Sequence, residues 1–374
     1  MTTKPEHFGQ FLSLILVILL ASSAFGQNGD GGPALEAQLL HPVGVALDQR
    51  GNLYVSEAGA YRIRKVDSRG IITTVAGIGR RGFSGDGGPA VGAGISAPHD
   101  LVLDEKGNLY FTDSFNNRIR KVDTRGIITS IAGTGKNGGS GDGGAALRAE
   151  LNNPQGIAID RQGNLLVADT FNHVIRRIDK SGMITTIAGS KPGYGGDGAP
   201  AINALLSIPY AVEEALDGTI YISDSGNSRI RKIDSAGHIQ HIVGFGPASG
   251  LFGAGFAGDG GQAKEAKIYS AVDIGFDGTG NLYISDTGNN RIRRVANGII
   301  ATIAGTGEAS FGGDGGKAVN AQLNTPQKLV VDRNGNIYFA DMPNHRIRKI
   351  DTQGIITTIA GSGEVSGHIY ELGR

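Results

Sequence analysis

One position that recurs six times along the chain carries side chains able to bind or activate a polar ligand. The residues around it keep a common pattern, while the pair itself changes from Val-Gly to pairs with imidazole, carboxylate, amide, phenol or ammonium groups. Such groups carry charge and exchange hydrogen bonds, which is the chemistry of polar recognition. The six pairs are Val43-Gly44, His99-Asp100, Gln155-Gly156, Tyr210-Ala211, Val272-Asp273 and Gln327-Lys328. We therefore predict a ligand-binding set at one mouth of a central channel, made of His99, Asp100, Gln155, Tyr210, Asp273, Gln327 and Lys328.

Carboxylates close to this position suggest a metal hypothesis. Glu213 and Glu214 stand in one copy where the others have apolar residues. Buried carboxylates are costly unless they are paired or hydrated, so we expect this pair to meet the channel or a cation. The weak metal candidates are Asp100, Glu213, Glu214 and Asp273. With His99 they offer the ligand types of zinc or calcium, although we expect no cofactor and assign no catalytic residue.

These residues belong to a repeat. The stretch Gly51–Gly77 returns five times, with opening glycines 55 to 62 residues apart. A GDGG-type loop keeps the same period, and two independent markers in phase indicate a repeat architecture. The repeat cores are 51–77, 107–133, 163–189, 218–244, 280–305 and 335–361, and the loop aspartates are Asp30, Asp86, Asp142, Asp197, Asp259 and Asp314.

Each copy contains four runs with strand character. In the second copy they are Leu101–Asp104, Asn108–Thr112, Arg118–Asp123 and Ile127–Ala132. Short turns between them favour an antiparallel meander, and a solenoid would leave open ends. The fold prediction is therefore all-β: a six-bladed β-propeller of four-stranded antiparallel blades, closed by packing of blade one on blade six. The turns between strands two and three and the blade-to-blade loops share one face, which we name the loop face.

The repeat resembles the NHL-repeat family of β-propellers. Asn172-His173-Val174 is similar to the Asn-His-Leu triplet of the family, and Asn-x-Arg takes its place in Asn116-Asn117-Arg118 and Asn344-His345-Arg346. GNLYISDTGNNRIRRV from Gly280 to Val295 is similar to the form common in secreted bacterial members. The resemblance covers residues 30–361 and implies a binding platform, with a minority of related propellers acting as lactonases or lyases. Blade one departs from the pattern with Glu57 and Ala60.

Residues that recur in every copy are interpreted as scaffold. An arginine on the third strand, such as Arg120, recurs with an aspartate that ends the second strand, such as Asp113, and we predict that the two pair within or between blades. An anion-binding ring of arginines is the alternative. The GDGG aspartates are predicted to cap their own turns, with calcium binding as the alternative. In contrast, Asp100 and Asp273 are expected to be solvated, so that their joint replacement by alanine changes stability by no more than about 0.5 kcal/mol.

Composition limits the function classes. Glycine makes up 62 of 374 residues, against roughly 7% in an average protein, and its fixed offsets indicate turns. The 35 basic residues balance 35 acidic ones, which argues against nucleic acid as a partner. The chain has no cysteine and therefore no disulfide.

The first 26 residues lie outside the repeat and resemble a signal peptide. An apolar run from Phe11 to Ala21 is followed by small residues up to Gly26, which indicates export with cleavage after Gly26. The run is short of the roughly 20 residues that span a bilayer, and an uncleaved anchor is the alternative. The mature chain, residues 27–374, would then be one periplasmic or extracellular propeller without a stable membrane span.

The sequence therefore predicts an exported, monomeric binding scaffold that holds a protein, a glycan or a small polar ligand on its loop face. The alternative is a metal-dependent lactonase- or lyase-like enzyme with its site at the channel mouth, resting on His99, Asp100, Glu213, Glu214 and Asp273. The longer loop Gly244–Gly258 before blade five could form a lid or a contact surface, or could be an unselected insertion.

Overall fold

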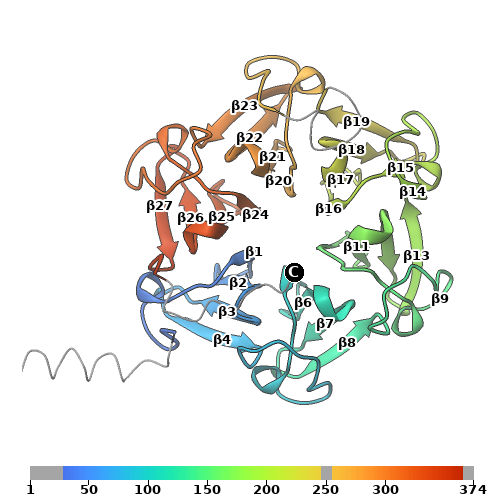
Figure 1. Cartoon of the computed structure of the whole chain (residues 1–374), viewed down its shortest axis with the longest axis horizontal. Coiled ribbons are helices and arrows are strands. Elements are labelled where there is room, and N and C mark those ends of the chain that lie inside the picture. The colour runs from blue at the N-terminus through green and yellow to red at the C-terminus, as the bar shows by residue number, and fades with distance from the viewer. Residues whose placement is uncertain (1–27, 246–254, 365–374) are drawn as a thin grey trace, which may run out of the picture.

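The computed structural model describes residues 28–245 and 255–364, and these form six four-stranded antiparallel blades around a central axis, one of which gains a fifth, two-residue strand at its outer edge (Figure 1). The predicted all-β, six-bladed propeller is confirmed. The signal-peptide prediction lies outside the described residues, as does most of the loop before blade five. Among the described residues, no helix is long and apolar enough to cross a membrane.

Each blade is a meander whose first strand lies nearest the axis and whose fourth lies outermost (Figure 1). Blade 1 contains β1 (Pro42–Leu47), β2 (Leu53–Glu57), β3 (Arg62–Val66) and β4 (Ile72–Ala76). Blade 2 contains β5 (Pro98–Leu103), β6 (Leu109–Asp113), β7 (Arg118–Val122) and β8 (Ile128–Ala132). Blade 3 contains β10 (Gly156–Ile159), β11 (Leu165–Asp169), β12 (Val174–Ile178) and β13 (Met183–Ala188). Blade 4 contains β16 (Pro209–Glu214), β17 (Ile220–Asp224), β18 (Arg229–Ile233) and β19 (Ile239–Val243). Blade 5 contains β20 (Asp273–Phe276), β21 (Leu282–Asp286), β22 (Arg291–Ala296) and β23 (Ile299–Ala304). Blade 6 contains β24 (Pro326–Val331), β25 (Ile337–Asp341), β26 (Arg346–Ile350) and β27 (Ile356–Ala360). The remaining short strands are β9 (Gly144–Ala145), β14 (Lys191–Pro192) and β15 (Leu205–Leu206).

Short 3-10 turns connect the strands on the loop face. One set lies between blades and the other between the second and third strands of a blade. The first set is η1 (Ala34–Glu36), η2 (Ala90–Gly92), η4 (Ala146–Arg148), η6 (Ala201–Asn203), η8 (Ala263–Glu265) and η10 (Ala318–Asn320). The second set is η3 (Ser114–Asn116), η5 (Thr170–Asn172), η7 (Ser225–Asn227), η9 (Thr287–Asn289) and η11 (Met342–Asn344).

Aspartates fix the hairpin turns on the opposite face. In blade 2, Oδ1 of Asp104 accepts hydrogen bonds from the backbone amides of Lys106 and Asn108 at 3.0 and 2.8 Å. Gly107 completes this turn with a φ of 86°, a conformation that glycine adopts without steric cost. Such self-bonded turns hold each meander in register.

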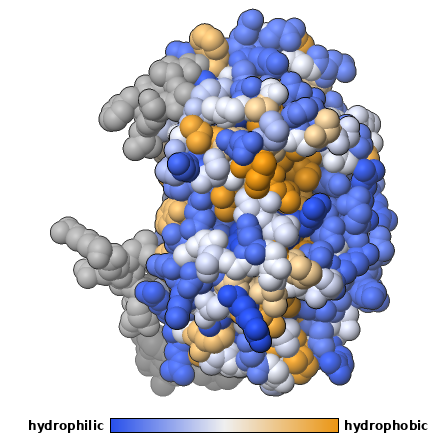
Figure 2. All heavy atoms as spheres, turned by 90° about the vertical axis from the view of Figure 1, so that its right-hand side faces the viewer, coloured by the Kyte–Doolittle hydropathy of each residue, from blue (hydrophilic) through white to orange (hydrophobic). Residues whose placement is uncertain are grey.

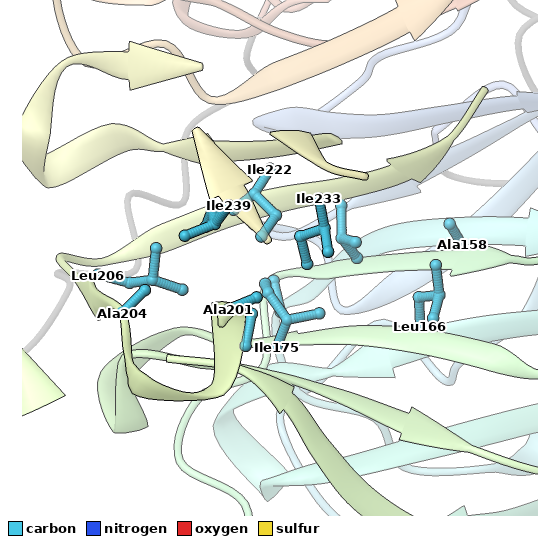
Figure 3. Close-up of a cluster of buried hydrophobic side chains, with 12 residues drawn as sticks. Ala158, Leu166, Ile175, Ala201, Ala204, Leu206, Ile222, Ile233 and Ile239 are labelled. Atoms are coloured by element: carbon cyan, nitrogen blue, oxygen red, sulfur yellow. The ribbon is translucent and has the colours of Figure 1, made fainter. Parts of the chain in front are cut away.

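The hydrophobic core lies between neighbouring blades. In the cluster between blades 3 and 4, Leu166 and Ile175 of blade 3 face Ile222 and Ile239 of blade 4, with Ala201 of the linking turn at the same cluster (Figure 3). Small alanines let the 3-10 turn approach both sheets. Burial of each large aliphatic side chain stabilises the fold by roughly 1.5–3 kcal/mol. A single blade therefore cannot bury its apolar faces by itself.

The ring closes through the segment that precedes blade 1. The amide of Gly361, after the last strand, donates to the carbonyl of Ala34 at 2.8 Å. Ala34 and Leu39 join one buried cluster with Val55 of blade 1 and Ile347 of blade 6. The predicted packing of blade one on blade six is thus confirmed. The linker before blade 1 packs between blades 6 and 1, as the linker that contains Ala201 packs between blades 3 and 4.

The repeated arginines are buried scaffold groups. Nη2 of Arg120 lies 2.8 Å from Asp86 in the GDGG loop, and its Nη1 lies 3.1 Å from Asp113. Equivalent pairs occur in all six blades, so the predicted Arg–Asp partnership is confirmed and the anion-ring alternative is wrong. The predicted turn cap is also wrong, because the second carboxylate oxygen of Asp30 accepts from the outer-strand amide of Thr74.

The outer wall on the side of blades 3 and 4 is mainly hydrophilic, with apolar side chains at several places and most densely in one patch (Figure 2). Met183 on β13 and Ile202 on η6 are among the exposed apolar residues of these two blades.

Candidate functional site

Bulges on the innermost strands turn the variable residues toward the channel. β5 begins at Pro98, three residues before the predicted start, and its pairing with β6 shifts register between Pro98 and Leu101. β24 has the same shift between Pro326 and Leu329. A bulge leaves residues unpaired and redirects their side chains. His99, Asp100, Gln327 and Lys328 therefore lie on the strands that line the axis and not in loops before them.

Three of the predicted residues form a buried ionic cluster, which we name the channel triad: Asp100, Asp273 and Lys328. Nζ of Lys328 lies 2.8 Å from Oδ2 of Asp100 and 3.1 Å from Oδ1 of Asp273. It also donates to the carbonyl of Tyr210 at 3.2 Å. The three side chains are only 4 to 13% exposed. The expectation that Asp100 and Asp273 are solvated is therefore wrong.

Backbone amides of the next blade complete the hydrogen bonding of the two carboxylates. Oδ2 of Asp100 accepts from the amide of Ile157 at 3.0 Å, and Oδ2 of Asp273 accepts from the amide of Leu329 at 2.7 Å. Blades 2 and 5, which carry the two aspartates, stand opposite each other in a ring of six (Figure 1). Each aspartate therefore also links its own blade to the following one.

The inner strand of blade 2 packs too closely against blade 1 at this level for blade 1 to carry a side chain. Gly44 occupies the position equivalent to Asp100, and a Cβ on it would lie 2.3 Å from the carbonyl oxygen of His99. The amide of Gly44 donates to Oγ of Ser56, which donates in turn to that same carbonyl. Lys328 on blade 6 thus reaches Asp100 on blade 2 beyond a blade that has no side chain at this position.

Burial dominates the electrostatics around the triad. It raises the pKa of Glu213 to about 8, with the charges of Asp273 and Asp100 adding to the shift. It raises the pKa of Asp273 to about 6 against the opposing effect of Lys328. It lowers the pKa of His99 to about 4, and the ammonium of Lys328 lowers it further. Although burial disfavours the charged amine, Asp100 and Asp273 raise the pKa of Lys328 above its usual value.

An ammonium group therefore occupies the position between Asp100 and Asp273 at which the metal hypothesis would place a cation. Among residues 28–245 and 255–364, no three histidine, aspartate or glutamate side chains converge as a metal site. Glu214 lies apart from the channel triad, since it accepts from the amide of Arg161 at 2.6 Å at the other end of β16. The structure thus separates Glu214 from Asp100 and Asp273.

Two further predicted residues serve their own blades. Nε2 of Gln155 donates to Oδ1 of Asn153 at 2.7 Å, and Nε2 of Gln327 donates to the carbonyl of Thr325 at 3.2 Å. Both glutamines are buried. Contact of these residues with a ligand stays a prediction.

A hollow of about 310 Å³ opens on the loop face between blades 2 and 3, and we name it the interblade pocket. Phe115 of η3 and Phe171 of η5 border it and are 43 and 46% exposed. The full lining is Arg81, Ser114, Phe115, Asn117, Asn137, Asn152, Asn153 and Phe171.

Phe115 and Phe171 are not among the site residues predicted from the sequence, although the sequence contains a signal for them. They stand at the middle of the turn between the second and third strands, where later copies have Gly226, Gly288 and Pro343. An aromatic residue at a position that the scaffold fills with glycine or proline indicates a role other than folding.

Comparison with known proteins places the fold among propellers of this repeat. A family model described as the Teneurin NHL domain matches residues 23–84, 134–193 and 306–368. Human teneurin-4 is 28% identical over 348 residues, which cover 84% of this chain and 12% of teneurin-4. Mouse teneurin-1 is also 28% identical, over 85% of this chain and 12% of its own length. The chain thus spans about an eighth of the length of these relatives.

Solved structures resemble the chain in fold. A Bacteroides thetaiotaomicron protein of unknown function has a TM-score of 0.63 at 19% identity, covering 87% of this chain and 73% of its own. An auxiliary nutrient binding protein from the same organism has a TM-score of 0.60 at 16% identity, with coverages of 86 and 70%. A streptogramin B lyase has a TM-score of 0.54 at 16% identity, with coverages of 88 and 84%. At these identities the likeness concerns the fold alone.

Proposed function

Since this chain belongs to the NHL-repeat β-propeller family, we propose that it is a binding module that holds a protein, glycan or small polar ligand on its loop face. The observation that carries this proposal is the interblade pocket, whose aromatic and amide side chains face solvent on rigid turns. Concave sites with apolar walls and a few polar groups are the usual form of ligand sites. Loops on a rigid scaffold are also the usual place for recognition.

The channel triad supports binding over catalysis. A general base or a catalytic metal ligand needs a free lone pair directed at the substrate. The carboxylates of Asp100 and Asp273 already accept from Lys328 and from backbone amides. The lactonase- or lyase-like alternative would have to use the lone pairs that these contacts leave free, in carboxylates that are only 13 and 8% exposed. Metal analysis of the purified protein tests that alternative, since stoichiometric zinc or calcium would favour the enzyme.

Export of the chain is part of the proposal. The support is the signal-like pattern of residues 1–26 and the structural likeness to an auxiliary nutrient binding protein. Intact-mass measurement of protein recovered from the envelope or the medium tests it. A mass that begins near Gln27 supports export with cleavage, whereas a chain that keeps its first 26 residues contradicts cleavage.

A comparison of the two faces tests the binding module directly. Neutral and acidic oligosaccharides, free amino acids and short peptides are titrated into the wild type, the F115A/F171A variant and the K106A variant. Lys106 lies in a turn on the opposite face, between β5 and β6. We expect at least one ligand class to bind the wild type and K106A equally and to lose at least tenfold in affinity in F115A/F171A. Binding that survives in F115A/F171A but is lost in channel variants would place the site in the channel instead.

A further inference from the structure

We propose that the interblade pocket binds a saccharide unit that carries a carboxylate. The inference rests on the proposed loop-face binding and narrows it to one ligand class and one place. The volume of the interblade pocket, about 310 Å³, is at the lower end of the roughly 300–1,000 Å³ typical of ligand pockets. A site of this size suits a single sugar ring better than an extended peptide.

Two phenyl rings form the apolar side of the pocket. The amide of Phe115 donates to the carbonyl of Ser96 at 3.2 Å, and that of Phe171 donates to the carbonyl of Asn152 at 3.1 Å. Their turns end at Asn117 and His173 in the left-handed conformation, with φ of 50 and 59°. The backbone therefore fixes the two turns, and the phenyl side chains on them are 43 and 46% exposed. Exposed phenyl faces complement the C–H faces of a pyranose.

Asparagine amides form the polar side. Oδ1 of Asn153 accepts from Gln155 at 2.7 Å, and Oδ1 of Asn137 accepts from Asn117. Within the described part of the chain, the Nδ2 groups of Asn137 and Asn153 and the side chain of Asn152 have no hydrogen-bond partner. An amide both donates and accepts, as a sugar hydroxyl does. These groups therefore match a polyol, and Gln155 acts as a positioning residue for Asn153.

Arg81 supplies the preference for an acidic group. Its guanidinium lies 5.6 Å from the ring centre of Phe115 and is exposed. In the described ranges it forms no ion pair, and the pocket lining contains no aspartate or glutamate. The buried arginines of the scaffold, in contrast, are each paired with two carboxylates, as Arg120 is. A free guanidinium beside hydroxyl-binding amides fits a carboxylate, which it can bind through two parallel hydrogen bonds.

The test uses matched acidic and neutral probes. Trigalacturonate and the corresponding neutral galactose trisaccharide are titrated into the full chain by calorimetry at low and physiological salt. The wild type is expected to bind the acidic probe at least tenfold more tightly than the neutral one. R81A should lose that preference and keep its affinity for the neutral probe, whereas R80A, which changes an exposed arginine outside the pocket lining, should behave as the wild type.

Aromatic variants separate this proposal from the broader one. F115A/F171A should lose both probes, and F245A, which removes an exposed phenylalanine outside the pocket lining, should lose neither. An unchanged melting temperature shows that each variant is folded, which we expect because the scaffold accepts glycine at the equivalent of Phe115. Equal losses in R80A and R81A would overturn the role of Arg81. If the wild type binds neither saccharide but binds another ligand through the same phenylalanines, the saccharide proposal fails and the binding module stands.

Discussion

Nζ of Lys328 and Oδ2 of Asp100 lie 2.8 Å apart, although the two residues belong to blades 6 and 2. Blade 1 stands between these blades in the ring, so this ion pair spans the junction at which the ring closes. The second carboxylate of the channel triad, on Asp273 of blade 5, extends the connection to the other side of the axis. The triad therefore joins three blades across the channel.

Replacement of Lys328 by methionine should strongly destabilise the propeller at neutral pH. The variant leaves two buried carboxylates without their counter-ion, and breaking a buried pair in this way costs about 3–5 kcal/mol. The loss should be smaller at pH 5, because the pKa of Asp273, already about 6, rises further without the ammonium and the group is then protonated. Urea unfolding at pH 7 and pH 5 measures both effects.

The D100N/D273N/K328M variant is the matched control. It removes all three charges but keeps side-chain oxygens that can accept from the amides of Ile157 and Leu329. It should recover much of the stability lost in K328M. A K328M variant as stable as the wild type would show that the triad does not hold the ring.

Glu213 should make the propeller less stable as pH rises. Burial raises its pKa from 4.5 to about 8, so between these values the folded state holds a proton that the unfolded state has lost. Stability contributed by this group is complete below pH 4.5 and falls by at most about 1.4 kcal/mol per pH unit up to pH 8. E213Q, which cannot ionise, should remove this slope and be more stable than the wild type at pH 8.5. Equal slopes in the two proteins, measured by unfolding at several pH values, would show that Glu213 is hydrated.

Acid should weaken the closing junction through His345. Its Nδ1 accepts from the amide of His41 at 3.3 Å, and burial, with smaller effects from His41 and Arg346, lowers its pKa below 6.5. The unfolded state then binds the proton first, so stability falls as pH drops below about 6.5. The stability of H345N should depend less on acid, because an asparagine side chain accepts the same backbone hydrogen bond without titrating. At two other junctions Oδ1 of Asn117 and of Asn290 already accepts from the equivalent backbone amide, at 2.8 Å in each case.

The measurement for this prediction is the change in melting temperature between pH 7.5 and pH 5.5. H173N is the parallel variant at the junction of blades 3 and 4, where Nδ1 of His173 accepts from the amide of Ile208 at 3.1 Å. If H345N, H173N and the double variant lose as much melting temperature at pH 5.5 as the wild type does, neither histidine is the source of the acid sensitivity.

A scaffold arginine should be far more important for stability than a surface one. Arg176 is 1% exposed and lies 2.7 Å from Asp142 and 3.6 Å from Asp169. R176M leaves the buried Asp169 carboxylate uncompensated and should cost about 3–5 kcal/mol. R125A removes an ion pair with Asp123 from a side chain that is 81% exposed and should cost less than about 1 kcal/mol. Similar unfolding free energies for R176M and R125A would contradict the scaffold role of Arg176.

The sequence predicted the parts of this protein that depend on local and repeated chemistry. Strands such as Arg118–Val122 combine branched apolar residues with charged ones, and Asp and Gly mark the turns at fixed offsets. No single copy can bury both faces of its sheet without a neighbour on each side, which favours a closed ring of six. The variable positions, including Asp100 and Lys328, could be selected because they depart from a pattern that is itself visible in the sequence.

The tertiary structure decided which of these variable residues meet. Three blades lie between Asp100 and Lys328 along the chain, and only ring closure and the bulges of β5 and β24 bring the two side chains to 2.8 Å. It also decided that their carboxylate and ammonium are buried, because exposure depends on what the opposite blades place in the channel. The pocket between blades 2 and 3 has the same origin: Phe115 and Phe171 lie 56 residues apart in sequence, and the packing of neighbouring blades sets them around one hollow.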